Sequence, residues 1–104
     1  MKRVITSPEA DLDIDTAISY YASESQKATA DFLREMSAAY DRISEMPGMG
    51  SPRLSRELGI EDLRSYSLDA FPYSLVYFER ENHIDLVRVL HTHRDIFNLL
   101  FGAI

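Results

Sequence analysis

The sequence predicts an α+β domain with the element order β-α-α-β-β-β, in which an N-terminal helical hairpin covers one face of a mainly antiparallel sheet. Two observations support this prediction. Residues 73–78 and 84–90 are mostly β-branched, aromatic or leucine and are separated by a polar stretch, which indicates a β-hairpin. Upstream, two segments repeat apolar residues at helical spacing, so each predicts a helix with one apolar face.

The first helix follows a short strand predicted at residues 2–6. Ser7 followed by Pro8 indicates its start, because serine can cap free backbone N–H groups and proline fits the first helical position. Its apolar stripe consists of Ala10, Ile14, Ala17, Ile18 and Tyr21. Since Tyr20 is adjacent to Tyr21, only one of the two can face the core, and Tyr20 is expected to cover a partner.

The second helix is predicted after a short polar break at residues 23–27, so the two helices should form an antiparallel hairpin. Its apolar stripe consists of Phe32, Leu33, Met36, Ala39, Tyr40 and Ile43. Proline and glycine at residues 46–52 end this helix. Residues 53–62 are compatible with either an irregular loop or a single helical turn.

Three strands complete the predicted sheet. The first spans residues 63–68, and the other two form the hairpin at 73–78 and 84–90. Both faces of this hairpin are largely apolar, which predicts that it lies inside the sheet rather than at its edge. Residues 95–100 are expected to form one or two helical turns, followed by an apolar tail.

Length and composition limit the class of protein. A chain of 104 residues fits a single domain spanning 1–104. The absence of cysteine excludes disulfides and thiolate metal sites and is compatible with a reducing cytoplasm. No signal peptide is evident, and no apolar run approaches the roughly 20 residues of a membrane span. We therefore expect a cytoplasmic protein without membrane contact.

The net charge of −6, with a pI near 4.9, argues against nonspecific nucleic-acid binding. Acidic residues cluster early in the chain, whereas most arginines lie in its second half. A basic helical partner or another protein surface suits this distribution better than DNA.

Polar residues crowd the end of the last strand, where His91 and His93 lie two residues apart. In a regular strand both would share a face with Asp85. Asp85 would then lie about 20 Å from His91, too far to share a mononuclear metal site, so no metal is expected. For His91, a structural hydrogen bond and a functional role remain equally open.

Arg88 interrupts an apolar strand, and a buried arginine must be paired. A structural salt bridge to Asp31, Glu35 or Asp95 is therefore favoured over phosphate binding.

Several motifs of this sequence, taken together, resemble those of a known protein family. They are the Ser-Pro-Glu-Ala helix entry, the turn at residues 46–50, Leu63-Arg64, the strand at 73–77 and above all Arg88-Val-Leu-His-Thr-His-Arg-Asp95. In this order the chain resembles the ParE branch of the RelE/ParE toxin superfamily. The resemblance implies the toxin of a bacterial type II toxin-antitoxin pair, which a ParD-like antitoxin with a ribbon-helix-helix N-terminus holds inactive. It also implies that the freed toxin poisons DNA gyrase by protein contact, with no cofactor and no direct DNA binding of its own.

Two alternatives stay open. RelE-like members cleave messenger RNA on the ribosome, and here such chemistry would depend on Arg64, His91, His93 and Arg94. The acidic charge and the lack of any lysine after Lys27 count against it. The other alternative is a degenerate toxin that only binds its antitoxin.

The resemblance and the chemistry together suggest two sets of contact residues. We expect target contacts from Arg64, His91, His93, Arg94, Phe97 and Phe101. We expect antitoxin contacts from Tyr20, Leu99, Leu100 and Ile104. The apolar tail either packs back on the sheet or forms an exposed patch that binds a protein.

Overall fold

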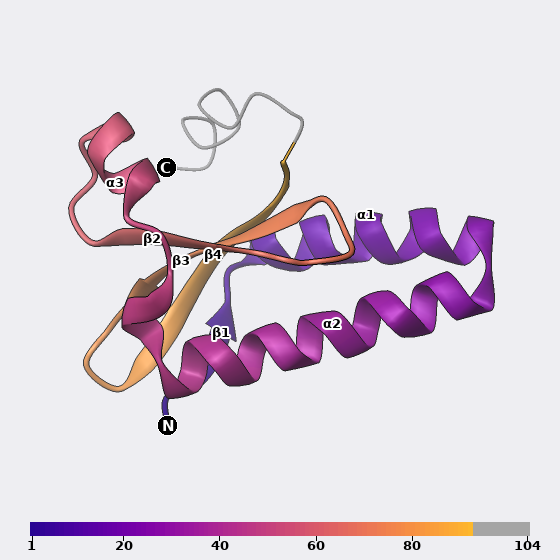
Figure 1. Ribbon diagram of the computed structural model, residues 1–104, viewed down its shortest axis with the longest axis horizontal. Coiled ribbons are helices and arrows are strands. Elements are labelled where there is room, and N and C mark those ends of the chain that lie inside the picture. Colours follow the sequence, from indigo (N-terminus) through magenta and orange to yellow (C-terminus); the bar gives the residue numbers. More distant parts are fainter. Residues whose placement is uncertain (93–104) are drawn as a thin grey trace.

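A computed structural model describes residues 1–92 and gives an α+β fold, as predicted (Figure 1). Its elements are β1 (Arg3–Thr6), α1 (Pro8–Glu24), α2 (Gln26–Glu45), the 3₁₀ turn η1 (Pro47–Met49), α3 (Arg53–Leu58), β2 (Leu63–Ser67), β3 (Tyr73–Glu79) and β4 (His83–His91). The strands form one sheet in the order β1-β4-β3-β2. β1 pairs with β4 in parallel, whereas β4 with β3 and β3 with β2 are antiparallel. The predicted fold is confirmed.

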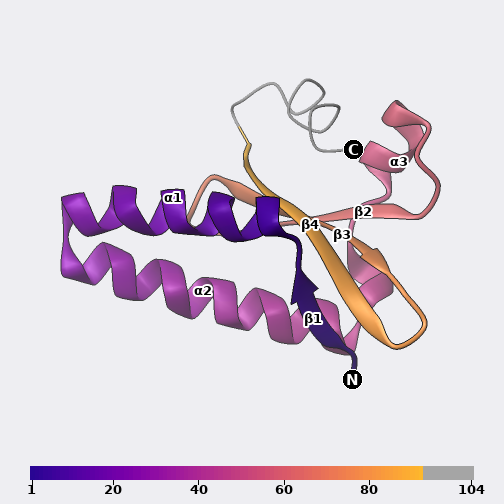
Figure 2. The ribbon, with the colours of Figure 1, turned by 180° about the vertical axis from the view of Figure 1, so that it is seen from behind.

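The helical hairpin has a tighter corner than the sequence suggested. Helices α1 and α2 run side by side, as both ribbon views show (Figures 1 and 2). Only Ser25 separates them, because this residue ends one helix and starts the next. Its N–H donates to the Tyr21 carbonyl (2.9 Å), and its Oγ accepts from the Ala28 N–H (3.0 Å). The polar break predicted at 23–27 is therefore mostly helical.

The main core lies between the helical hairpin and one face of the sheet. All five residues of the α1 stripe belong to it, as the sequence predicted. In α2 the buried line consists of Phe32, Met36, Ala39 and Ile43. Leu33, which the sequence assigned to the same stripe, is 46% exposed. Adjacent helical residues point about 100° apart, so burial of Phe32 turns Leu33 toward solvent.

A second, smaller core lies on the opposite face of the sheet, beneath α3. Its buried members are Leu54, Leu63, Val76 and Leu90. For residues 53–58 the sequence allowed either an irregular loop or a helical turn. They form α3, which covers this face of the sheet. β3 and β4 are thus central strands covered on both sides, which confirms the prediction from their apolar faces.

A β-bulge in β4 changes which face each later residue occupies. Leu86 is opposite Tyr77 and Arg88 is opposite Val76, so Val87 is one extra residue in β4. Ile84 and Leu86 lie in the main core before the bulge, and Val89 lies there after it. Asp85 and His91 are therefore on opposite faces, and the predicted common face for these two residues is wrong.

Candidate functional site

The end of β4 brings His91 against the helical hairpin. The His91 ring meets the Tyr73 ring edge-on, with centroids 5.3 Å apart. Tyr73 in turn contacts Phe32 and Tyr21, at centroid distances of 5.7 and 6.4 Å. Burial raises the pKa of Tyr21, helped by the neighbouring Tyr73 and Tyr20. His91 thus lies at the outer end of a packed aromatic row.

A small hollow of about 130 Å³ lies between this strand end and α1. Thr16, Ala17, Tyr73 and His91 are among its lining residues. His91 is half-buried at the rim of this hollow.

Arg88 forms a structural salt bridge, as the sequence favoured, and its acidic partner within residues 1–92 is Asp13 rather than Asp31 or Glu35. Asp95, the third predicted partner, lies outside the described residues. The Arg88 Nε and Nη2 donate to the two carboxylate oxygens of Asp13, at 2.7 and 2.9 Å. The side chains are only 14% and 16% exposed. The hydrogen bonds to Asp13 raise the pKa of Arg88 above its usual value, although burial acts in the opposite direction. Asp31 instead pairs with Lys27 and Arg34, and Glu35 accepts from the Ala70 N–H.

Arg64 is tied to the loop after α2 rather than standing open on a rim. Its Nη1 donates to the Gly50 carbonyl (2.8 Å). The Tyr77 hydroxyl donates to the Pro47 carbonyl (2.5 Å), and Ser51 and Ser65 form an isolated β-bridge. Arg64 is therefore half-buried and supports the position of residues 47–51.

Tyr20 occupies the surface position that the sequence predicted. It is 56% exposed and meets Tyr21 edge-on at a centroid distance of 5.1 Å. The other predicted contact residues lie outside the described residues. These are His93, Arg94, Phe97, Leu99, Leu100, Phe101 and Ile104.

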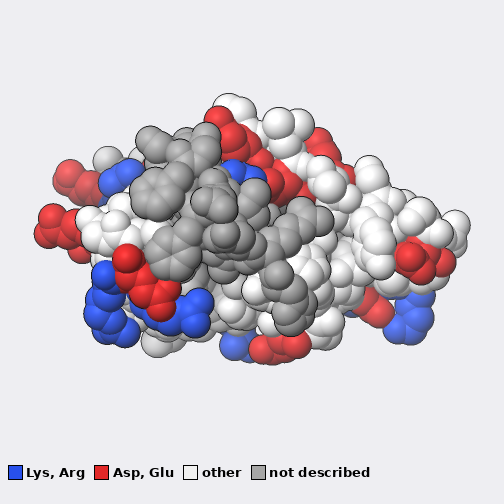
Figure 3. All heavy atoms as spheres, turned by 90° about the horizontal axis from the view of Figure 1, so that it is seen from above, with Lys and Arg blue, Asp and Glu red and all other residues white. Residues whose placement is uncertain are grey.

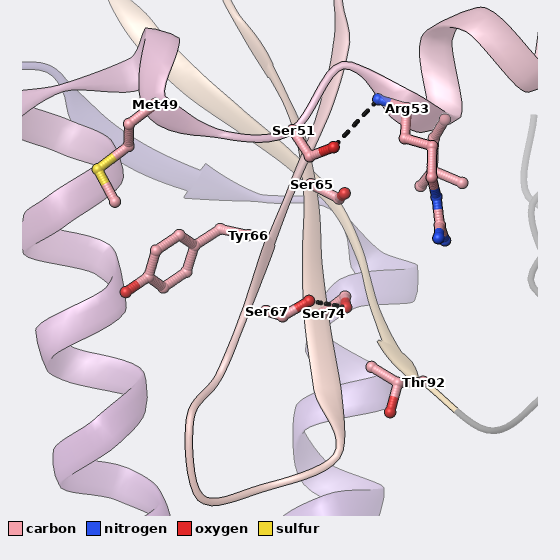
Figure 4. A pocket seen from close by; sticks show the side chains of 9 residues that line it. Met49, Ser51, Arg53, Ser65, Tyr66, Ser67, Ser74 and Thr92 are labelled. Carbon is pink, nitrogen blue, oxygen red and sulfur yellow. Dashed lines mark hydrogen bonds between the residues drawn. The ribbon is translucent and has the colours of Figure 1, made fainter.

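A larger hollow, of about 530 Å³, lies beside β2 and α3 (Figure 4). Hydroxyl side chains from separate elements line it, and the hollow also borders one cation, Arg53. The hydroxyl residues are Ser51, Ser65, Ser67, Ser74 and Thr92. Figure 4 shows the Ser67 and Ser74 hydroxyls bonded to each other (2.9 Å) and Ser51 accepting from the Arg53 N–H (3.2 Å). Tyr66 also lines this hollow, and within residues 1–92 no histidine or carboxylate does.

Comparison with known proteins decides the family. The family model described as "ParE toxin of type II toxin-antitoxin system, parDE" matches residues 4–96. The chain belongs to the ParE toxin family. A solved structure entitled "Chromosomal ParDE TA system from P. aeruginosa" has the same fold, with a TM-score of 0.72. The match covers 89% of this chain and 98% of that chain at 15% sequence identity, and it therefore supports the fold alone. No curated protein matches the chain.

This ParE-family chain has two further properties within residues 1–92. The described residues contain no group of three His, Cys, Asp or Glu side chains that could hold a metal ion. Among the same residues, no helix combines the length and apolar character needed to cross a membrane.

The residues that sequence reasoning missed are Asp13 and the hydroxyl residues around the large hollow. Asp13 looked like one of several acids that favour a helix N-terminus. No local pattern distinguishes it, because its partner Arg88 lies 75 residues away. The serines of β2 do alternate along the strand, and this alternation was the available signal for a polar face.

Proposed function

We propose that this ParE-family chain is neutralised by a cognate ParD-like antitoxin with a ribbon-helix-helix N-terminus. When freed in the cytoplasm, it poisons DNA gyrase by protein contact, without a cofactor and without being an enzyme. The family match over residues 4–96 carries the toxin assignment. The choice of gyrase depends on the resemblance of the last strand and its exit, residues 88–95, to the ParE branch.

The charge of the molecule supports protein binding over RNA cleavage. No lysine or arginine occurs between residues 4 and 26, so every charged side chain of α1 is acidic, and four of these acids lie in its first half. Figure 3 shows a run of acidic side chains along the upper edge of the view, and other acidic side chains beside Lys and Arg elsewhere on this face. Arg88 is neutralised by Asp13, and Arg64 already donates to a carbonyl. These two arginines are therefore poor candidates for a phosphate clamp.

The proposed target contacts are His91, His93, Arg94, Phe97 and Phe101, with Arg64 acting through the loop that it holds. Ribosome-dependent cleavage is kept as the second candidate because His91 borders a hollow, and histidine is the side chain that most often acts as a general acid or base.

Purified protein should be compared in two assays, DNA supercoiling by gyrase and messenger-RNA cleavage on the ribosome. We expect inhibition of supercoiling that the cognate antitoxin reverses, and no cleavage. Cleavage without gyrase inhibition would overturn the proposal in favour of a ribonuclease. Inactivity in both assays, with antitoxin binding retained, would identify a chain that only binds its antitoxin.

The proposed antitoxin surface combines the exposed ring of Tyr20 with Leu99, Leu100 and Ile104. An amphipathic antitoxin helix or an extended segment would cover such apolar side chains.

A chain that ends after Asp95 should lose antitoxin binding or toxicity. Loss of several apolar anchors typically weakens an interface by about thirtyfold or more. Titration calorimetry with the antitoxin and the supercoiling assay measure the two effects, and circular dichroism checks folding. Leu33→Ala is the control, because it removes an exposed leucine of α2 that neither surface includes. A folded truncation that is fully toxic and fully neutralised would remove the tail from both surfaces.

A further inference from the structure

β4 continues beyond its neighbour β1. β1 pairs only with residues 83–86 of β4, and the register ends where Thr6 meets Leu86. From Val87 onward, the backbone on this edge of β4 no longer faces β1. An unpaired strand edge leaves N–H and C=O groups without partners and allows the strand to shift its register.

Beyond the end of β1, residues at the start of α1 supply hydrogen-bond partners to this edge of β4. The Ser7 N–H donates to the Leu86 carbonyl (3.0 Å), and the Ser7 Oγ donates to the Val87 carbonyl (2.7 Å). Asp13 Oδ2 then accepts from the Val89 N–H (3.0 Å). The same carboxylate holds the Arg88 guanidinium through both of its oxygens.

These contacts coincide with the bulge at Val87. Without the extra residue, Arg88 would follow Ile84 and Leu86 into the main core, and His91 would turn to the opposite face. With it, Arg88 meets Asp13 at the sheet edge and His91 meets Tyr73. The bulge and its α1 partners therefore decide which face His91 occupies.

We propose that Ser7 and Asp13 form an edge latch that fixes the bulged end of β4, so that Asp13 is a positioning residue for the toxin's strand exit. The latch holds the His91 ring against Tyr73 at the end of β4. This inference builds on the proposed function, because the strand exit is the proposed contact with gyrase. Asp13 itself acts through Val89 and Arg88 and does not touch the target.

The test compares Asp13→Ala with Asp15→Ala, an exposed acid of the same helix, and with Arg88→Lys, which keeps a cation opposite Asp13. Nuclear magnetic resonance measures amide exchange at Val89 and the cross-relaxation between the His91 and Tyr73 rings. In Asp13→Ala we expect amide exchange at Val89 to become about tenfold faster, because one hydrogen bond is lost. We also expect the contact between the His91 and Tyr73 rings to be lost. The concentration needed for half-inhibition of gyrase should rise by about tenfold. Asp15→Ala should stay within about twofold of the natural chain. Arg88→Lys loses the two-oxygen pair with Asp13 but leaves the carboxylate able to accept the Val89 N–H, so Val89 should stay protected in it.

A variant in which the two charges are exchanged distinguishes the role of the Val89 hydrogen bond from the role of the Asp13–Arg88 ion pair. Asp13→Arg with Arg88→Asp restores opposite charges, but an arginine at position 13 cannot accept the Val89 N–H. We expect this double variant to keep fast Val89 exchange and weak gyrase inhibition. Recovery of full inhibition without Val89 protection would overturn the latch as a positioning device.

The outcomes remain distinguishable from failure of the proposed function. Unchanged Val89 exchange and an unchanged ring contact in Asp13→Ala would overturn the latch whatever the target. If the natural chain does not inhibit gyrase, the target assignment fails, and the two spectroscopic readouts still decide the latch. Should Asp13→Ala not fold, the double variant Asp13→Leu with Arg88→Met is measured in the same way, because it removes the acceptor of the Val89 N–H together with both charges while it retains apolar volume. A fully protected Val89 and an intact ring contact in this double variant would then overturn the proposal.

Discussion

Replacing Arg88 with methionine should lower the free energy of unfolding by about 3 kcal/mol, because it leaves the Asp13 carboxylate without its cation in a largely buried site. Urea denaturation followed by circular dichroism measures this loss. Arg80→Met is the matched control. Arg80 pairs with Asp85 at 3.2 Å on the surface, so its loss should cost less than about 1 kcal/mol.

The double variant Asp13→Leu with Arg88→Met should recover most of this loss, since it removes both charges and retains apolar volume. About 1 kcal/mol should remain lost, because the Val89 N–H then has no acceptor at position 13. Equal destabilisation by Arg88→Met and Arg80→Met would contradict the assignment of Arg88 to a buried pair.

Replacing Gly50 with alanine should destabilise the fold by about 3 kcal/mol through overpacking. A β-carbon at position 50 would lie 2.2 Å from the Tyr77 hydroxyl oxygen and 2.9 Å from Cζ of the same ring. The Tyr77 ring is fully buried and its hydroxyl is bonded to the Pro47 carbonyl, so the ring has little room to withdraw. Thermal and urea unfolding measure the effect.

Gly48→Ala is the control for this substitution, because a β-carbon at position 48 would meet no atom within 4 Å. We expect it to change the free energy of unfolding by less than about 1 kcal/mol. Adding Tyr77→Phe to Gly50→Ala removes the closest clashing atom and should restore part of the stability, while the Pro47 carbonyl loses its donor. If Gly50→Ala is as stable as Gly48→Ala, this result would contradict the close packing of Gly50 against the Tyr77 ring of β3.

Local signals predicted most of the elements. Ser7 and Pro8 start α1 as expected, and the residues at 46–52 end α2. The central position of the β3–β4 hairpin followed from its two apolar faces. These features depend on neighbouring residues and on periodicity, which can be read directly along the chain.

The candidate site was less accessible to sequence reasoning. The sequence identified the strand exit and a buried arginine, but it sought the partner of Arg88 in Asp31 or Glu35 of α2 or in Asp95. Within residues 1–92 the acidic partner of Arg88 belongs to α1, because β1 lies parallel to β4. The chain leaves β1 in the direction in which β4 continues, which places the first turns of α1 beside residues 86–89.

The sequence by itself determined the element order, the apolar faces that meet in the core and the resemblance to ParE toxins, since each is encoded in local residue types and their spacing. Only the tertiary structure decided the face of His91, the anchoring of Arg64 and the pairing of Arg88 with Asp13. The physical reason is that one extra residue in β4 reverses the alternation of all later side chains, and such a bulge depends on contacts between segments about 75 residues apart.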